Sequence, residues 1–247
     1  KRQVGHHATT YAPANLHLGQ YWPHLSEFFT EPGRWVVHVF LVIAGYLSAR
    51  SLQSPRRINW VTLSAGRYLR LMPLYALALL LTVLVGAWVR PHYAPDFVSQ
   101  TPDWKLWLSH LTLSQDLWHH EAIMAGSWYV AIDFQLFVCL ALWLWFWQGS
   151  ALAQRLTWLP PMAMMCCVWL SAWLISRQAH MDIWAPYFWA SYGLGCMAAW
   201  AVAQPQWRSW FYLTLLGLAL DAVFEMRGRQ CLASLTAAGL WLWSMQR

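Results

Sequence analysis

One uninterrupted apolar segment constrains the fold of this chain more than any other feature. Residues 127–147 run for 21 residues and contain one charged side chain, Asp133. A helix of that length crosses the hydrocarbon core of a bilayer, which is about 30 Å thick. A carboxylate at that depth costs at least a few kcal/mol unless it faces a partner or a water-filled cavity. We therefore interpret Asp133 as a candidate functional residue, the alternative being an acid that only holds helices together.

The composition places the whole chain in a membrane. Hydrophobic residues make up 59% of the sequence and charged residues only 11%, against about 25% charged residues in a soluble domain. Many of the 21 tryptophans lie near the ends of apolar runs, as in the aromatic belts at a lipid–water interface. The net charge of +6 does not indicate nucleic-acid binding, because the basic residues are not spread over a soluble face.

The apolar runs predict an all-α fold, a polytopic transmembrane helix bundle of about seven spans. The expected spans are residues 35–49, 71–89, 127–147, 156–175, 183–203, 207–224 and 230–245. Their spacing leaves no room for a second soluble domain, so we expect residues 1–247 to form a single integral membrane domain. The chain begins at Lys1 rather than Met, and we expect this domain to be incomplete.

The loop 50–70 sets the expected orientation. It carries five arginines and no acid, and basic loops stay in the cytoplasm. Residues 1–34 and 90–126 then lie on the outer side. The five arginines are Arg50, Arg56, Arg57, Arg67 and Arg70.

Two of these arginines form a candidate anion site. Arg67 and Arg70 are three residues apart, so on a helix they share one face. Pro73 is expected in the first helical turn, where its missing N–H is not needed. Bidentate phosphate binding favours arginine over lysine. The alternative is that the pair only fixes the topology or touches lipid headgroups.

Histidines supply the candidate bases. His38 lies within the first span, where a buried histidine is more often neutral with one hydrogen bond than functional; Gly45, in the same run, would let another backbone approach closely. The pairs His6-His7 and His119-His120 lie on the outer side in this orientation. Histidine is the usual general base near neutral pH. No metal is expected, because adjacent histidines point in different directions and no metal-ligand spacing is present.

The other polar and thiol groups have more modest expected roles. Asp133 is expected to orient a histidine or to pair with an arginine inside the bundle. Asp221, near the end of a span, is expected to be structural or solvated. The five cysteines are expected to be small core residues rather than a disulfide framework: Cys139, Cys166, Cys167, Cys196 and Cys231.

Three motifs follow one another along the chain: residues 39–47 (VFLVIAGYL), residues 67–75 (RYLRLMPLY), and Trp128 with Asp133 and Gln135. In this order they resemble acyltransferase family three, the integral membrane O-acyltransferases of bacterial surface glycans. The family's corresponding runs are VFFVLSGYL, R-x-x-R-I-x-P-x-Y and W-S-L-x-x-E-x-Q-F-Y. The later spans match only as apolar helices.

The resemblance implies an enzyme that transfers groups other than amino-acyl groups. Such an enzyme takes an acyl group, usually acetyl from acetyl-CoA, on the cytoplasmic side and transfers it to a hydroxyl of a surface or periplasmic glycan. It would be a multi-pass protein of the bacterial inner membrane, in contact with lipid. The resemblance also implies a catalytic histidine, which His7 or His6 matches by position.

The resemblance assigns roles to other residues as well. Asp133 would orient or pair with a cation, and Arg67 with Arg70 would bind the phosphates of coenzyme A. The substrate-binding candidates are His38, Trp128, Gln135 and Tyr75.

The chain departs from the family pattern in several places. The family's first helix and its basic residue are missing, because Lys1 and Arg2 stand too near His6 to fill that role. Asp133 replaces the usual Glu and Ala44 the usual Ser. Fewer helices are expected than the family has, with the C-terminal helices lacking.

Two further classes of function compete with the enzyme. A polytopic transporter or channel would place Asp133 and His38 on the solute path. Against it, the halves show no inverted repeat, and the arginine pair is left without a task. The other alternative is a non-catalytic membrane remnant. The acceptor glycan, the acyl group and the oligomeric state stay open.

Overall fold

The computed structural model describes most of the chain, and every regular element in the described part is helical. His6 and His7 lie outside the described residues. So does Glu121, next to His120. The described residues are 32–53, 57–92, 101–120, 122–124, 126–225 and 228–246.

All seven segments predicted as spans contain a helix. These are α4 (Pro32–Ser51), α5 (Trp60–Val89), α7 (Ser127–Gln148), α9 (Leu159–Trp173), α10 (Ala185–Ala203), α11 (Gln206–Glu225) and α12 (Gly228–Met245). Shorter helical elements fill the connections: η1 (Arg90–His92), α6 (Trp104–Leu111), α8 (Ala151–Arg155), η3 (Ile175–Arg177) and η4 (Ala179–Met181). The all-helical class is therefore confirmed.

Three stretches in the described part of the chain are long and apolar enough to cross a membrane. They are Trp60–His92, Ser127–Gln148 and Leu159–Arg177, and Trp35–Ser51 is a shorter apolar helix. The chain is thus a membrane protein, and the count of seven spans stays a prediction.

The start of α5 was predicted wrongly. The expected cytoplasmic loop ran to residue 70, but the helix begins at Trp60, where the Asn59 side chain accepts hydrogen bonds from the first turn. Pro73 therefore lies well inside α5 rather than in its first turn. Its missing N–H removes one backbone hydrogen bond, the one to the carbonyl of Leu69. Arg67 and Arg70 consequently lie on a helix and not in a loop.

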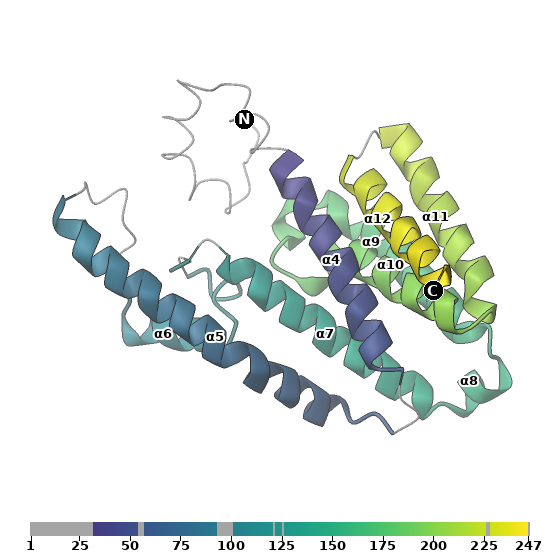
Figure 1. Cartoon of the computed structure of the whole chain (residues 1–247), viewed down its shortest axis with the longest axis horizontal. Helices are drawn as coiled ribbons and strands as arrows, with labels where there is room; N and C mark the ends of the chain where they lie inside the picture. Colours follow the sequence, from purple (N-terminus) through teal and green to yellow (C-terminus); the bar gives the residue numbers. More distant parts are fainter. Residues whose placement is uncertain are drawn as a thin grey trace. The chain divides into compact units, whose positions relative to one another are not determined.

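The chain divides into two compact units. Unit 1 comprises residues 1–57 and 146–247, and unit 2 comprises residues 58–145. In unit 1, α10 packs against α4, α9, α11 and α12, while α12 also contacts α4 (Figure 1). Almost all of α10 is buried, as expected for a helix that is apolar on every side.

Two glycines bring α4 and α10 into backbone contact. A Cβ on Gly45 would collide with the backbone carbonyl of Tyr192, and a Cβ on Gly195 would collide with the carbonyl of Val42. Small residues allow such close approach between helices in membranes. The expectation that Gly45 lets another backbone approach is confirmed.

Unit 2 consists of α5, α6, α7 and the segment between the last two (Figure 1). Its core contains side chains from α5, from α7 and from the segment between α6 and α7: Met72, Tyr75, Leu79, Leu113, Ile123 and Ala131. Leu113 adopts a positive φ of 55°, which is unfavourable for a leucine. Burial of its side chain, only 4% exposed, holds this turn after α6.

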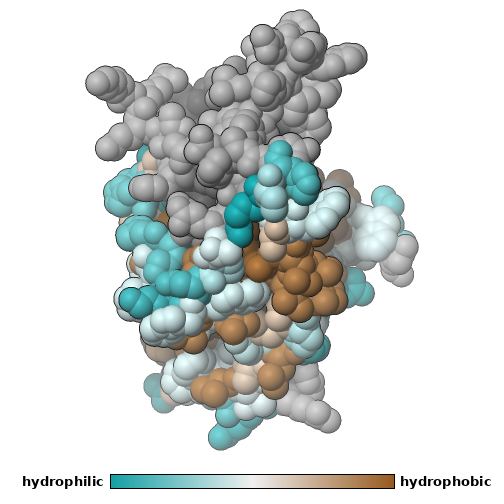
Figure 2. Space-filling view, turned by 90° about the vertical axis from the view of Figure 1, so that its left-hand side faces the viewer, coloured by the Kyte–Doolittle hydropathy of each residue, from teal (hydrophilic) through white to brown (hydrophobic). Residues whose placement is uncertain are grey.

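Exposed apolar residues mark the surface of α5. They follow one another along the helix: Leu69, Leu74, Leu77, Leu80, Leu81, Leu84, Val85 and Trp88. Figure 2 shows a patch of apolar side chains bordered by hydrophilic ones on the face it presents. Surface of this kind suits contact with lipid.

The five cysteines are free thiols, but the prediction that all are core residues was wrong. Cys196 is buried, whereas Cys166 and Cys231 are exposed. An apolar run alone does not tell a core-facing thiol from one on the outer face of a helix.

Candidate functional site

The intramembrane acid of unit 2 has an arginine partner. Arg67, in the second turn of α5, donates from Nη2 to Oδ2 of Asp133 in α7 at 2.6 Å. The guanidinium carbon of Arg67 also lies 4.5 Å from the centre of the Phe137 ring. The side chain of Asp133 is 11% exposed and that of Arg67 28%. The expectation that Asp133 pairs with an arginine is confirmed.

The ion pair leaves two polar atoms without partners among the described residues. Oδ1 of Asp133 and Nε of Arg67 are buried and make no hydrogen bond. One is an acceptor and the other a donor. A buried polar atom that lacks a partner loses its hydration without replacement. A small polar group that both donates and accepts would satisfy the two atoms.

Arg70 lies in a different environment from Arg67. Its Nε donates to the Gly66 carbonyl of its own helix at 3.2 Å, and the residue is exposed. The two arginines are neighbours on α5, but one is held by an acid and the other is turned to the surface. Arg70 is therefore the more accessible cation for a phosphate.

A second polar pair lies two turns further along α5. Oη of Tyr75 is 3.0 Å from Nδ1 of His110 in α6, and Nε2 of His110 accepts the backbone N–H of Ile123 at 3.3 Å. Because Nε2 accepts, the ring proton of neutral His110 resides on Nδ1 and is donated to Tyr75. His110 is fully buried and Tyr75 is 4% exposed.

A buried glutamine ties this region to the start of α7. Gln115 donates from Nε2 to the carbonyl of Ser127 at 3.2 Å and to Asp116 at 3.3 Å. Gln115 and Ser127 are both fully buried. The bond fixes where α7 begins, and hence how far along the helix Asp133 stands.

Sequence reasoning did not select His110 or Gln115. Neither belongs to one of the three motifs, and both come from the connection 90–126, which was expected to be a loop. The available signal for helix α6, which carries His110, is Asp103. Its side chain caps the helix by accepting from the backbone N–H of Leu106.

The remaining candidates of unit 2 lie along α7. Trp128 and Gln135 are half-buried on either side of Asp133 in sequence, and the Trp128 ring meets that of Tyr129 edge-on. The structure thus brings six of the predicted residues into unit 2: Arg67, Arg70, Tyr75, Trp128, Asp133 and Gln135.

His38 belongs to unit 1. Its Nδ1 is 2.7 Å from Oγ of Ser191 in α10, and its ring lies 6.0 Å from that of Phe188. His38 is half-buried, and one hydrogen bond to a serine is the arrangement of an ordinary structural histidine, which was the less functional of the two expectations.

The remaining polar candidates are two histidines and one acid. His119 and His120 lie in the turns between α6 and α7, where His119 has a positive φ of 54°. The described residues contain no group of three His, Cys, Asp or Glu side chains that could hold a metal. Asp221 is 7% exposed and pairs with Arg177 at 2.9 Å, so its role is structural rather than solvated unless a ligand also uses it.

Comparison with known proteins identifies one relationship. The family model of the acyltransferase domain, acyltransferase family 3, matches residues 4–244. The match covers both units and all the motif residues discussed above. No curated protein and no solved structure gives a significant match.

Proposed function

The chain belongs to acyltransferase family 3, and we propose that it transfers an acetyl group from acetyl-CoA to a hydroxyl of a glycan. Membership makes it an acyltransferase of groups other than amino-acyl groups. The family match over residues 4–244 is the observation that carries this conclusion. Acetyl as the acyl group, coenzyme A as its carrier and a glycan as the acceptor are our proposals.

The proposed reaction is a nucleophilic substitution at a thioester. The acceptor hydroxyl attacks the carbonyl carbon of acetyl-CoA, a C–O bond forms, and the C–S bond breaks. A histidine takes the hydroxyl proton, and the sulfur leaves as the thiolate of coenzyme A and is then protonated. We propose His7 or His6 as this base; a positioned general base contributes about 10²–10⁴-fold in rate.

Unit 2 supplies the proposed donor site. We propose that Arg70, which is exposed, binds a phosphate of coenzyme A. Arg67 would border the same site, with one nitrogen held by Asp133. Asp133 would then act as a positioning residue, because it fixes the direction of the Arg67 guanidinium.

The proposed substrate contacts differ in how available they are. Tyr75 and His38 already bond His110 and Ser191, so a substrate would have to share or displace those partners. Trp128 and Gln135 are half-buried on α7. We propose that these two also contact the substrate.

Nothing in the structure or the comparisons favours the transporter alternative. The proposed setting is the bacterial inner membrane, with the donor in the cytoplasm and the acceptor outside. That arrangement follows the orientation expected from the five arginines of residues 50–70.

The test is an acetyl-transfer assay with radiolabelled acetyl-CoA on the full chain in lipid nanodiscs, with envelope polysaccharide as acceptor. We expect His7→Ala or His6→Ala to abolish transfer, and Arg70→Gln to raise the KM for acetyl-CoA about tenfold with little change in kcat, because a charged hydrogen bond to phosphate is lost. Arg155→Gln is the control, because Arg155 is on α8, outside the proposed site. Full activity in both histidine variants would refute the catalytic assignment.

A further inference from the structure

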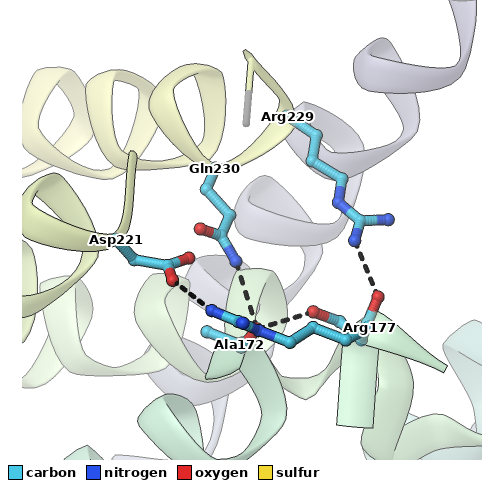
Figure 3. Close-up of polar contacts among 6 residues, drawn as sticks. Ala172, Arg177, Asp221, Arg229 and Gln230 are labelled. Carbon is cyan, nitrogen blue, oxygen red and sulfur yellow. Dashed lines mark hydrogen bonds and ion pairs between the residues drawn. The ribbon is translucent and has the colours of Figure 1, made fainter. Parts of the chain in front are cut away.

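A cluster of charged and amide side chains lies at one end of unit 1. Arg177 of η3 donates from Nη2 to Oδ1 of Asp221 in α11 at 2.9 Å. Gln230 of α12 donates from Nε2 to the Ala172 carbonyl of α9 at 3.5 Å. Figure 3 shows Asp221 and Gln230 extending from their helices toward Arg177 and Ala172. We call this set, with Arg229, the polar cluster.

Arg229 closes the cluster from its other side. Its Nη1 donates to Oη of Tyr187 at 2.9 Å, and its Nη2 donates to the Ser176 carbonyl at 2.7 Å. Its guanidinium carbon lies 5.5 Å from the centre of the Tyr187 ring. Residues of α9, η3, α10, α11 and α12 therefore meet here.

Two acceptor atoms of the cluster have no partner in the described part of the chain. They are Oδ2 of Asp221 and Oε1 of Gln230. The side chain of Asp221 is 5% exposed and Gln230 is 6% exposed. The bond from Nε2 of Gln230 to Ala172 fixes the orientation of the amide, so its oxygen is the orphan. Buried acceptors of this kind require a donor.

The chemistry of the cluster selects among ligand classes. A metal cation would be repelled by two guanidiniums. A simple anion would meet the arginines but would face two unpartnered acceptor oxygens. A hydroxyl group both donates and accepts, so adjacent hydroxyls can donate to Asp221 and Gln230 while accepting from an arginine. We propose that the polar cluster binds a hydroxyl-rich ligand, a sugar unit of the acceptor.

The position of the cluster agrees with this ligand. Arg229 bonds Tyr187 near the start of α10, whereas Gln53, from the segment expected in the cytoplasm, bonds the Ala199 carbonyl near its end. These positions are about 18 Å apart at 1.5 Å per residue. In the expected orientation the cluster lies at the outer end of unit 1, where a glycan is available.

An aromatic ring borders the cluster. A Cβ on Gly228, in the first turn of α12 beside Arg229, would collide with the ring of Trp35. Trp35 is 37% exposed, so part of this residue is accessible beside the start of α12. A flat apolar surface beside hydroxyl-binding groups suits a sugar ring, which has an apolar face as well as hydroxyls.

The identification of the sugar as the acceptor rests on the proposed function, but its binding can be measured without an acyl donor. The probes are methyl glucoside, methyl galactoside and N-acetylglucosamine, titrated against the full chain in nanodiscs and followed by saturation-transfer NMR. Inorganic phosphate is titrated in parallel. We expect at least one sugar to bind and phosphate not to compete with it.

Two variants on different helices test the site. Gln230→Met removes the orphan oxygen at constant chain length, and Asp221→Asn removes the charge at constant shape. Each is expected to weaken sugar binding about tenfold or more. The matched control is Gln53→Met. It also loses a hydrogen bond from a side-chain amide to a helix carbonyl, but that carbonyl lies at the other end of α10 from the cluster. It should bind as the parent chain does.

The outcomes separate this inference from the proposed function. Equal sugar binding in both cluster variants and the control would overturn the inference. So would phosphate binding that depends on the cluster, and so would a parent chain that binds none of the sugar probes. Cluster-dependent sugar binding supports it even where acetyl transfer is absent. A thermal unfolding scan of each variant checks that the fold is retained, and Arg229→Lys, which keeps the charge, serves as a third variant where one of the two does not fold.

Discussion

The ion pair between Arg67 and Asp133 gives the sharpest prediction for this chain. Asp133→Asn keeps the shape of the side chain and removes its charge. The guanidinium of Arg67 then keeps a weaker acceptor at the 2.6 Å contact, while its positive charge loses its counter-ion. We expect the variant to unfold more easily and to hold Arg67 less firmly.

The magnitude follows from the burial of the two partners. Removing one partner of a fully buried ion pair costs about 3–5 kcal/mol, and a hydrogen bond to a charged group contributes about 1.5–3 kcal/mol. The side chain of Arg67 is 28% exposed, so solvent can stabilise part of the charge left behind. We therefore expect Asp133→Asn to lower the free energy of unfolding by about 1–3 kcal/mol.

A double-mutant cycle isolates the pair from everything else that Asp133 does. Unfolding by denaturing detergent in mixed micelles is measured for Arg67→Gln, Asp133→Asn and the double variant. The coupling energy should be about 1–2 kcal/mol. Arg70→Gln is the matched control, because Arg70 is one turn along α5 and bonds only its own helix in the contacts above. The reasoning would be refuted if the coupling energy between Arg67 and Asp133 were no larger than that between Arg70 and Asp133.

Two other predictions concern packing and a buried hydrogen bond. Gly195→Ala should destabilise unit 1 by about 2 kcal/mol or more, because its Cβ would collide with the backbone of α4. The control Gly239→Ala has open space around its Cβ and should stabilise the chain by about 0.5–1 kcal/mol. Equal effects of the two substitutions on unfolding would contradict the close approach of α4 and α10. Tyr75→Phe should cost about 1–3 kcal/mol, since it removes the buried hydroxyl that bonds Nδ1 of His110. Tyr68→Phe loses an exposed bond and should cost about 1 kcal/mol or less; a larger loss for Tyr68→Phe than for Tyr75→Phe would contradict this ranking by burial.

The sequence predicts the helices well because membrane helices are long apolar runs with few alternatives. Every expected span contains a helix, and the largest error is the start of α5. Residues 60–66 mix polar and small side chains with apolar ones, so they do not continue the apolar run. Asn59 was the available signal, because asparagine is a preferred cap.

From the sequence, the site can be predicted only where a single residue by itself requires a partner. Asp133 requires a partner because of its depth, and that requirement could be read from one segment. Which arginine satisfies it depends on how far α5 extends and on how it lies against α7, which no local pattern gives. The hydrogen bond between His110 and Tyr75 could not be predicted from the sequence, because it joins a motif residue to a short helix that carries no motif.

The satisfaction of buried polar atoms separates groups that hold the fold from groups that can hold a ligand. Both ring nitrogens of His110 are bonded, so substitutions of His110 should chiefly lower stability. Asp133 and Asp221 each bond an arginine through one oxygen while the other oxygen lacks a partner among the described residues. The second oxygen of each acid costs about 1–3 kcal/mol while it is unpaired. A ligand hydroxyl would recover that cost, and so substitution of either acid should weaken ligand binding as well as the fold.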